Sequence, residues 1–137
     1  MNARSCGDGM REKRPTLIPL ARIHDSRGSL LPLEWEDLPF RPQRIFTING
    51  VPPGTVRGCH GHQTCAQLLV AIAGEIEVRV VQDGEHRTIV LTPDSPGLLV
   101  PAGIWFSQTY VSADAVLLVL ASEPYNPDAT FDDPGAA

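Results

Sequence analysis

Residues 75–81 alternate between charged and aliphatic side chains, with the charged residues on odd positions. Because successive side chains of a β-strand point to opposite faces, this pattern predicts a half-buried strand. Asp83 and Gly84 follow directly, and glycine tolerates the positive φ of a tight two-residue turn. We therefore expect a hairpin whose second strand runs through residues 88–91.

Short apolar runs recur along the rest of the chain, separated by proline and glycine, and no helical period persists over three turns. We expect further strands over residues 44–49, 55–62, 67–72, 97–100, 105–111 and 115–121. Many short strands at roughly 8–12-residue spacing are typical of a sandwich or jelly-roll barrel. The pattern therefore predicts an all-β fold.

The 137 residues are enough for one domain with a proper hydrophobic core, and we find no repeat or linker that would divide them. Residues 1–15 are polar and without periodicity, so we expect a disordered N-terminal tail. Residues 16–127 then form the barrel. Residues 128–137 are acidic and interrupted by proline, which predicts a loosely held C-terminal tail.

The chain carries 11 Lys and Arg against 16 Asp and Glu, a formal net charge of −5. Nucleic acids and anionic membranes are therefore not expected as partners, although a local basic site for a small anion is compatible with this balance. No apolar stretch reaches the roughly 20 residues of a membrane span, and the N-terminus has no apolar signal core. Three cysteines without a paired spacing favour a reducing compartment, so we expect a cytoplasmic protein.

Two histidines, His60 and His62, stand two positions apart in the expected strand 55–62. Positions two apart share one face, so both imidazoles should project to the same side, which in a small barrel is the ligand-binding lumen. Partly exposed packing is the alternative for this pair. We assign no role to His24, which has no visible partner, or to His86, which follows the turn of the expected hairpin.

The segment around the pair resembles the first motif of the cupin superfamily. That motif consists of a glycine, five residues, His-x-His, a glutamate and, after six residues, a second glycine. The chain matches it at Gly54, His60, His62 and Gly74, with Gln67 in place of the glutamate. The resemblance implies a single-domain cupin jelly-roll β-barrel.

Most cupins bind a divalent metal through three histidines and a carboxylate, and this chain lacks two of those four ligands. Gln67 is neutral, and no histidine follows the turn at residues 101–103, where the second motif would supply one. We therefore expect no metal, although a metal-dependent cupin such as a dioxygenase stays open. Two imidazoles without a metal are suited to general acid–base chemistry, because histidine titrates near neutral pH. Proton transfer at carbon without redox change is the reaction class expected.

Over residues 20–126 the chain is similar to the nucleotide-sugar 3,4-ketoisomerases, also called WxcM-like or FdtA-like cupins. The similarity is carried by Asp25, Arg27, Gly28, Arg44, Val51, Gly54, Arg57, Gly58, His60, His62, Gln67, Gly74, Gly97, Pro101, Trp105 and the segment 116–122. It implies a homodimer that needs no cofactor. It also implies isomerisation of dTDP-4-keto-6-deoxyglucose to the 3-keto sugar, a step toward the deoxyamino sugars of surface polysaccharides or antibiotics.

The catalytic roles follow from the acidity of a hydrogen beside a ketone. A base can remove the proton from C3 to give an enediolate, and an acid can reprotonate C4. We assign these two roles to His60 and His62 without fixing their order. Arg57 could neutralise the enediolate or the diphosphate, since guanidinium binds such groups in a forked geometry.

Four further residues are candidates for substrate binding. Arg27 and Arg44 are candidates for the nucleotide end, with surface ion pairs as the alternative. Gln67 and Trp105 are expected to line the lumen, with core packing as the alternative for Trp105.

The chain departs from the family pattern at three places near these residues. Gln63 stands where members usually have lysine, and Phe46 and Thr47 stand where they commonly have adjacent tyrosines. Two other functions therefore stay open. One is a non-catalytic cupin that binds a nucleotide sugar or a small anion, and the other is a C3/C5 epimerase, which would use similar acid–base groups.

Overall fold

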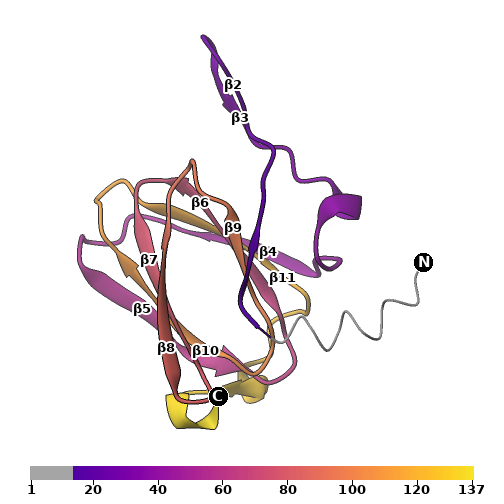
Figure 1. Ribbon diagram of the computed structural model, residues 1–137, viewed down its shortest axis with the longest axis vertical. Helices are drawn as coiled ribbons and strands as arrows, with labels where there is room; N and C mark the ends of the chain where they lie inside the picture. The colour runs from indigo at the N-terminus through magenta and orange to yellow at the C-terminus, as the bar shows by residue number, and fades with distance from the viewer. Residues whose placement is uncertain (1–13) are drawn as a thin grey trace.

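The computed structural model describes residues 14–137, so the expected N-terminal tail lies almost entirely outside the described residues. Two five-stranded antiparallel sheets face each other as a jelly roll, which confirms the all-β, single-domain cupin fold (Figure 1). The first sheet has the order β1 (Thr16–Ile18), β9 (Gly97–Val100), β6 (Gln67–Ala73), β11 (Val116–Ala121), β4 (Arg44–Ile48). The second has the order β12 (Thr130–Phe131), β5 (Thr55–His62), β10 (Trp105–Tyr110), β7 (Ile76–Gln82), β8 (Glu85–Leu91).

The expected hairpin is formed by β7 and β8, which pair from Ile76 opposite Leu91 to Gln82 opposite Glu85. The turn residue Asp83 has a φ of 53° and Gly84 a φ of 79°. Both angles lie in the left-handed region that a two-residue hairpin turn of this type requires. The aliphatic positions of β7 are buried and its charged positions exposed, as the alternation predicted.

Apolar side chains fill the space between the two sheets. The core cluster there comprises Val51, Leu69, Ala71, Ile76, Val78, Val80, Leu91, Leu98, Val100, Ile104, Phe106, Tyr110, Ala115, Leu117 and Val119. A second cluster lies on the outer face of the first sheet, where Leu68, Val70, Leu99 and Leu120 are covered by apolar residues from the segment 18–40. That segment includes the short 3₁₀ helix η1 (Trp35–Asp37).

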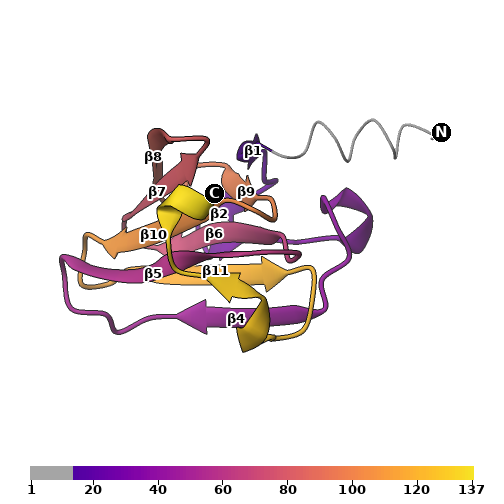
Figure 2. The same cartoon turned by 90° about the horizontal axis from the view of Figure 1, so that it is seen from below.

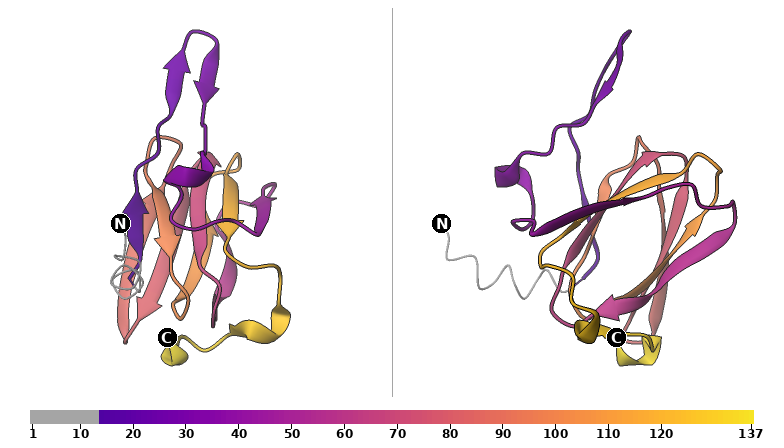
Figure 3. Two further views of the ribbon diagram at one scale, coloured as in Figure 1. Left: turned by 90° about the vertical axis from the view of Figure 1, so that its right-hand side faces the viewer. Right: turned by 180° about the vertical axis from the view of Figure 1, so that it is seen from behind.

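A small hairpin of β2 (Ile23–Asp25) and β3 (Gly28–Leu30) extends away from the barrel (Figure 3). Ile23 and Leu30 are directly opposite each other in this hairpin, and both side chains are more than half exposed. These strands have three residues each, too few to give a periodic signal in the sequence. No helix in residues 14–137 combines the length and apolar character needed to cross a membrane.

The segment 128–137 is attached to the barrel, in contrast to the loosely held tail expected from its composition. After the 3₁₀ helix η2 (Pro127–Ala129), strand β12 pairs with the end of β5, with Thr130 opposite His62 and Phe131 opposite Gly61. The chain then forms the 3₁₀ helix η3 (Pro134–Ala136). Figure 2 shows this segment, in yellow, crossing one end of the barrel. Backbone pairing holds the segment, and this could not be deduced from its prolines and acidic residues.

Candidate active site

A cavity of about 340 Å³ opens between the two sheets, where β4 and β5 face each other. This volume is within the range of about 300–1,000 Å³ that is usual for small-molecule sites. Aromatic and aliphatic side chains, Phe46, Ile48, Phe106 and Val119, form the apolar part of its wall. The remaining wall is polar and comes from β4, β5, β6, β10 and the C-terminal segment.

A β-bulge at Cys59 decides which side chains of β5 reach the cavity. His60 pairs with Phe106 and Gly58 pairs with Ser107, so Cys59 is the extra residue with no partner on β10. Gly58 has a φ of 83° and Cys59 a φ of 61°, the left-handed conformations that accommodate such a bulge. An extra residue reverses the inside–outside alternation, and Arg57 therefore lines the same cavity as His60.

The two imidazoles lie together against Phe106, as the His-x-His spacing predicted. The ring centroids of His60 and His62 are 5.0 Å apart, and their planes are at 81° in an edge-to-face arrangement. The Phe106 ring lies 6.4 Å from the first and 6.3 Å from the second.

His60 is held by its own strand. Its Nδ1 lies 3.0 Å from the carbonyl oxygen of Gly58. Because a carbonyl oxygen only accepts hydrogen bonds, Nδ1 carries the proton and donates it. In the neutral ring Nε2 is then the unprotonated nitrogen, and its lone pair is available as a base.

His62 differs from His60 in its surroundings. Burial, the neighbouring His60 and the charge of Arg44 lower the pKa of His62 from 6.5 to about 4, against a smaller opposing effect of Glu123. This imidazole is therefore neutral at neutral pH. Within residues 14–137 its Nε2 is buried and has no hydrogen-bond partner.

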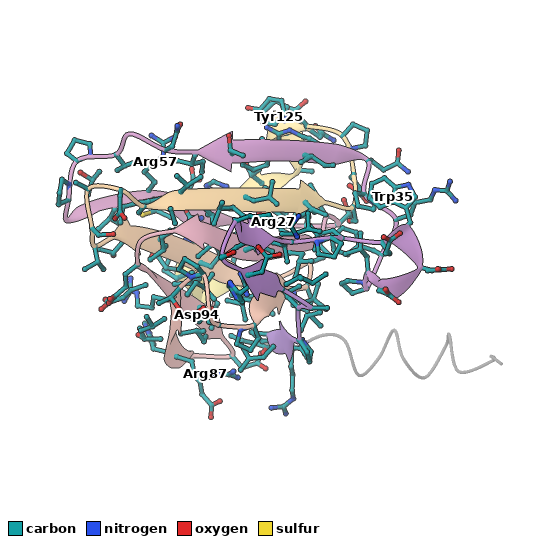
Figure 4. The ribbon with its side chains drawn as sticks, turned by 90° about the horizontal axis from the view of Figure 1, so that it is seen from above. Arg27, Trp35, Arg57, Arg87, Asp94 and Tyr125 are labelled. Atoms are coloured by element: carbon teal, nitrogen blue, oxygen red, sulfur yellow. The ribbon has the colours of Figure 1, made fainter. Side chains whose placement is uncertain are left out.

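Two arginines bring positive charge to the cavity. The guanidinium of Arg44 lies between two rings, 4.3 Å from the centroid of Phe46 and 4.9 Å from that of Tyr125. Stacking on two ring faces fixes this cation on the wall. Arg57 is more exposed, and Figure 4 shows it and Tyr125 on the same side of the molecule, at β4.

Two buried amides face the cavity from opposite sheets. Gln67 on β6 is 5% exposed, and Gln108 on β10 is 6% exposed. The sequence analysis included Gln67 and missed Gln108. A signal was present, because Gln108 shares its strand parity with Phe106 and Tyr110, and a polar residue on an otherwise apolar face often belongs to a site.

Trp105 and Arg27 lie outside the cavity, contrary to their expected roles. Trp105 is opposite Gly61, one residue before Phe106, and so faces the other side of β10. There its Nε1 donates to the carbonyl oxygen of Asp132 at 3.1 Å, and it packs as a buried residue. Arg27 is on the projecting hairpin, where it forms an exposed ion pair of 2.6 Å with Asp25.

The other two histidines of the chain also lie away from the cavity. His24 contacts Ser29 Oγ at 2.6 Å in the projecting hairpin, and His86 lies 3.4 Å from a guanidinium nitrogen of Arg79 on β7. Within the described residues, no three His, Cys, Asp or Glu side chains gather in an arrangement that could hold a metal ion.

The C-terminal segment completes the wall of the cavity. Tyr125, Pro127, Thr130 and Asp132 all line it. Gly61 on β5 makes this docking possible, since a Cβ there would collide with the Phe131 ring and lie 2.8 Å from the carbonyl oxygen of Ile104. The glycine between the two histidines therefore leaves room for the segment that covers them.

A cupin barrel with two imidazoles side by side in its cavity defines the class of the protein, and comparison with known proteins identifies the family. The family model described as "FdtA: WxcM-like, C-terminal" matches residues 13–134. The TDP-4-oxo-6-deoxy-α-D-glucose 3,4-oxoisomerase of Aneurinibacillus thermoaerophilus is 35% identical over 113 residues, which are 80% of each chain.

Solved structures of sugar 3,4-ketoisomerases agree with this result. QdtA from Thermoanaerobacterium thermosaccharolyticum, in complex with TDP, is 32% identical with a TM-score of 0.82, over 87% of this chain and 88% of that one. The WlaRB TDP-quinovose 3,4-ketoisomerase of Campylobacter jejuni is 30% identical with a TM-score of 0.80, over 88% and 94%. The chain belongs to the FdtA, WxcM-like family and is an isomerase of the 3,4-ketoisomerase type.

Proposed function

We propose that this isomerase converts a dTDP-4-keto-6-deoxyhexose into its 3-keto isomer through an enediolate, with His60 as the base and without a metal or another cofactor. The observation that carries the proposal is the hydrogen bond from His60 Nδ1 to the Gly58 carbonyl, which leaves Nε2 as a proton acceptor in the cavity. Relatives that are 30–35% identical act on or bind TDP-linked sugars, which supports this substrate class.

The reaction moves two protons and no net electrons. His60 Nε2 takes the proton from C3, and the electron pair of the broken C–H bond shifts so that the oxygen on C4 becomes anionic. Protonation of that oxygen and loss of the proton from the oxygen on C3 give the isomeric enediolate. Return of a proton to C4 then completes the 3-ketone. A single imidazole within reach of both carbon atoms is able to take and return this proton.

The two histidines are therefore not equivalent in the proposed mechanism. His62 is neutral and its Nε2 is buried, so we give the proton transfer to His60. The neutral ring of His62 packs edge-on against His60 and helps to fix its orientation. Arg57 and Arg44 supply positive charge for the enediolate and for the diphosphate of the substrate.

Incubation of the wild-type protein with dTDP-4-keto-6-deoxyglucose in deuterated buffer tests the proposal, with NMR of the sugar as the readout. A 3-keto product is expected, with deuterium at C4 in those turnovers in which the protonated imidazole exchanges with solvent before it returns the proton. Deuterium at C5 would indicate an epimerase, and binding without any exchange would indicate a binding protein. Activity that disappears with a chelator and returns with iron, nickel or zinc would indicate a metal-dependent cupin. Each of these last three results would overturn the proposal.

The protein is further proposed to be a homodimer in which the β2–β3 hairpin packs against a second copy. The exposed pair Ile23 and Leu30 supports this, because an isolated two-stranded hairpin with apolar side chains gains stability when covered. Light scattering should give about twice the 14.8 kDa chain mass. Replacing both residues by Asp should give monomers, whereas Val90→Asp, at an exposed position on β8, should not. A monomeric wild-type protein would overturn the dimer.

A cytoplasmic location and a role in making deoxysugars for polysaccharides complete the proposal. The free thiols of Cys59 and Cys65 in the described residues support a reducing compartment. Thiol labelling of the protein in fractionated cells is expected to give reduced cysteines in the cytoplasmic fraction. Oxidised protein outside that fraction would contradict the location.

A further inference from the structure

Gln108 is a buried polar side chain on the cavity wall for which the reaction scheme above has no role. It pairs across the strands with Arg57, so both side chains share the inner face of the second sheet. The absent Cβ of Gly58 makes room for its amide, since a Cβ there would lie 3.0 Å from Gln108 Nε2. The bulge that directs Arg57 inward therefore also creates the space for this amide.

Tyr110 fixes which end of the amide is presented. Its hydroxyl donates to Gln108 Oε1 at 3.3 Å, within the same strand. The Tyr110 side chain is fully buried, and burial raises its pKa to about 12, so the phenol stays protonated and acts as the donor. With Oε1 occupied in this way, the NH₂ group of Gln108 is the end left to donate to a ligand.

From this arrangement we infer that Gln108 is a catalytic residue whose amide NH₂ donates to the substrate oxygen that becomes anionic in the enediolate, with Tyr110 as its positioning residue. This inference rests on the proposed function. Gln108 is two residues along β10 from Phe106, which pairs with His60. Two residues of a strand span about 7 Å, a spacing that fits a base beside C3 and a donor beside the oxygen on the neighbouring C4. A fixed donor aimed at developing negative charge lowers the barrier without first having to reorganise.

Steady-state kinetics with dTDP-4-keto-6-deoxyglucose test this role in four variants. Gln108→Met, which keeps the volume but has no donor, should lower kcat about 100-fold and change KM little. The kcat of Gln108→Glu should fall at least as far. Tyr110→Phe should lower kcat about tenfold, because the amide remains but is free to turn. The control Gln43→Met, an exposed glutamine outside the cavity, should behave as wild type.

The double variant Gln108→Met/Tyr110→Phe separates catalysis from folding. It removes both members of the buried hydrogen bond, so no unsatisfied hydroxyl remains to destabilise the barrel. Its kcat should equal that of Gln108→Met alone, because Tyr110 acts through Gln108. If the wild-type protein isomerises the substrate and the kcat of the folded double variant is within threefold of the wild-type value, the inference fails while the proposed function stands. If wild type shows no isomerisation at all, both fail together.

Discussion

The two halves of the barrel interior lie between the same two sheets and have opposite character. Around β7, β8 and β9 the interior is filled by aliphatic side chains with almost no exposure. Toward β4 and β5 it is hollow and lined by imidazole, guanidinium and amide groups. On β6 the change occurs in a single step of the inward face, from Gln67 at the cavity to Leu69 in the core. In the filled half the apolar side chains pack against one another, whereas the hollow half keeps polar atoms that can form hydrogen bonds with a ligand.

The comparison implies that chemistry and stability can be altered separately. His60→Asn should lower kcat about 10³-fold, the loss expected when a general base is removed, with an unchanged melting temperature. His86→Asn, a matched change outside the cavity, should leave turnover as it is. Turnover in the His60 variant within tenfold of wild type would place the base elsewhere.

The reverse separation is expected in the filled half. Leu69→Ala removes a fully buried side chain and should lower the free energy of unfolding by about 3 kcal/mol, measured by urea denaturation. At a temperature where the variant is folded, its kcat should stay within threefold of wild type. A large loss of kcat in folded protein would mean that the two halves are coupled.

The contact between β5 and the C-terminal segment that covers the cavity can be tested at Gly61. Gly61→Ala should displace the C-terminal segment and cost about 2 kcal/mol, because the new methyl group collides with Phe131. Hydrogen exchange should then increase over residues 126–137. Adding Phe131→Ala removes the ring that the methyl meets, so the double variant should recover part of the lost stability. No change in exchange would show that the segment docks without this glycine.

The smallest effect concerns the buried histidine. Below pH 6.5 the unfolded chain protonates His62, whereas the folded chain does so only near pH 4. The folded state therefore loses stability as the pH falls through this window, by about 1–2 kcal/mol after allowance for the part of the ring that solvent screens. In a His62→Gln variant the pH dependence of unfolding between 7 and 4 should be flatter by that amount. Equal slopes would contradict a depressed pKa.

Much of this architecture is predictable from alternation and spacing. The β7–β8 hairpin follows from strict period-two patterning and an Asp-Gly turn, and the shared face of His60 and His62 follows from their spacing. Trp105 was expected to line the lumen, but the neighbouring residue Phe106 lies there. Deciding between the two requires the register of β10 against β5. Registers come from pairing across the chain, which a single sequence does not display.

The C-terminal segment and Gln108 were missed for related reasons. The docking of residues 130–131 depends on a backbone partner and on the missing Cβ of Gly61, neither of which has a periodic signature. Gln108 is a polar residue on an apolar strand face, and this signal is visible in the sequence. The sequence does not show that the buried hydroxyl of Tyr110 orients its amide. Both features arise from tertiary contacts and not from local pattern.

The bulge at Cys59 has a consequence for how relatives of this chain are compared. If the strand paired regularly through Cys59, without the bulge, Arg57 would turn to the solvent and Val56 would enter the lumen. A substitution that abolishes the bulge would thus exchange a cation for an aliphatic side chain at the entrance without altering either amino acid. Homologues without a glycine at position 58, where the bulge has a positive φ, are therefore expected to prefer different ligands even where every other neighbouring residue is identical.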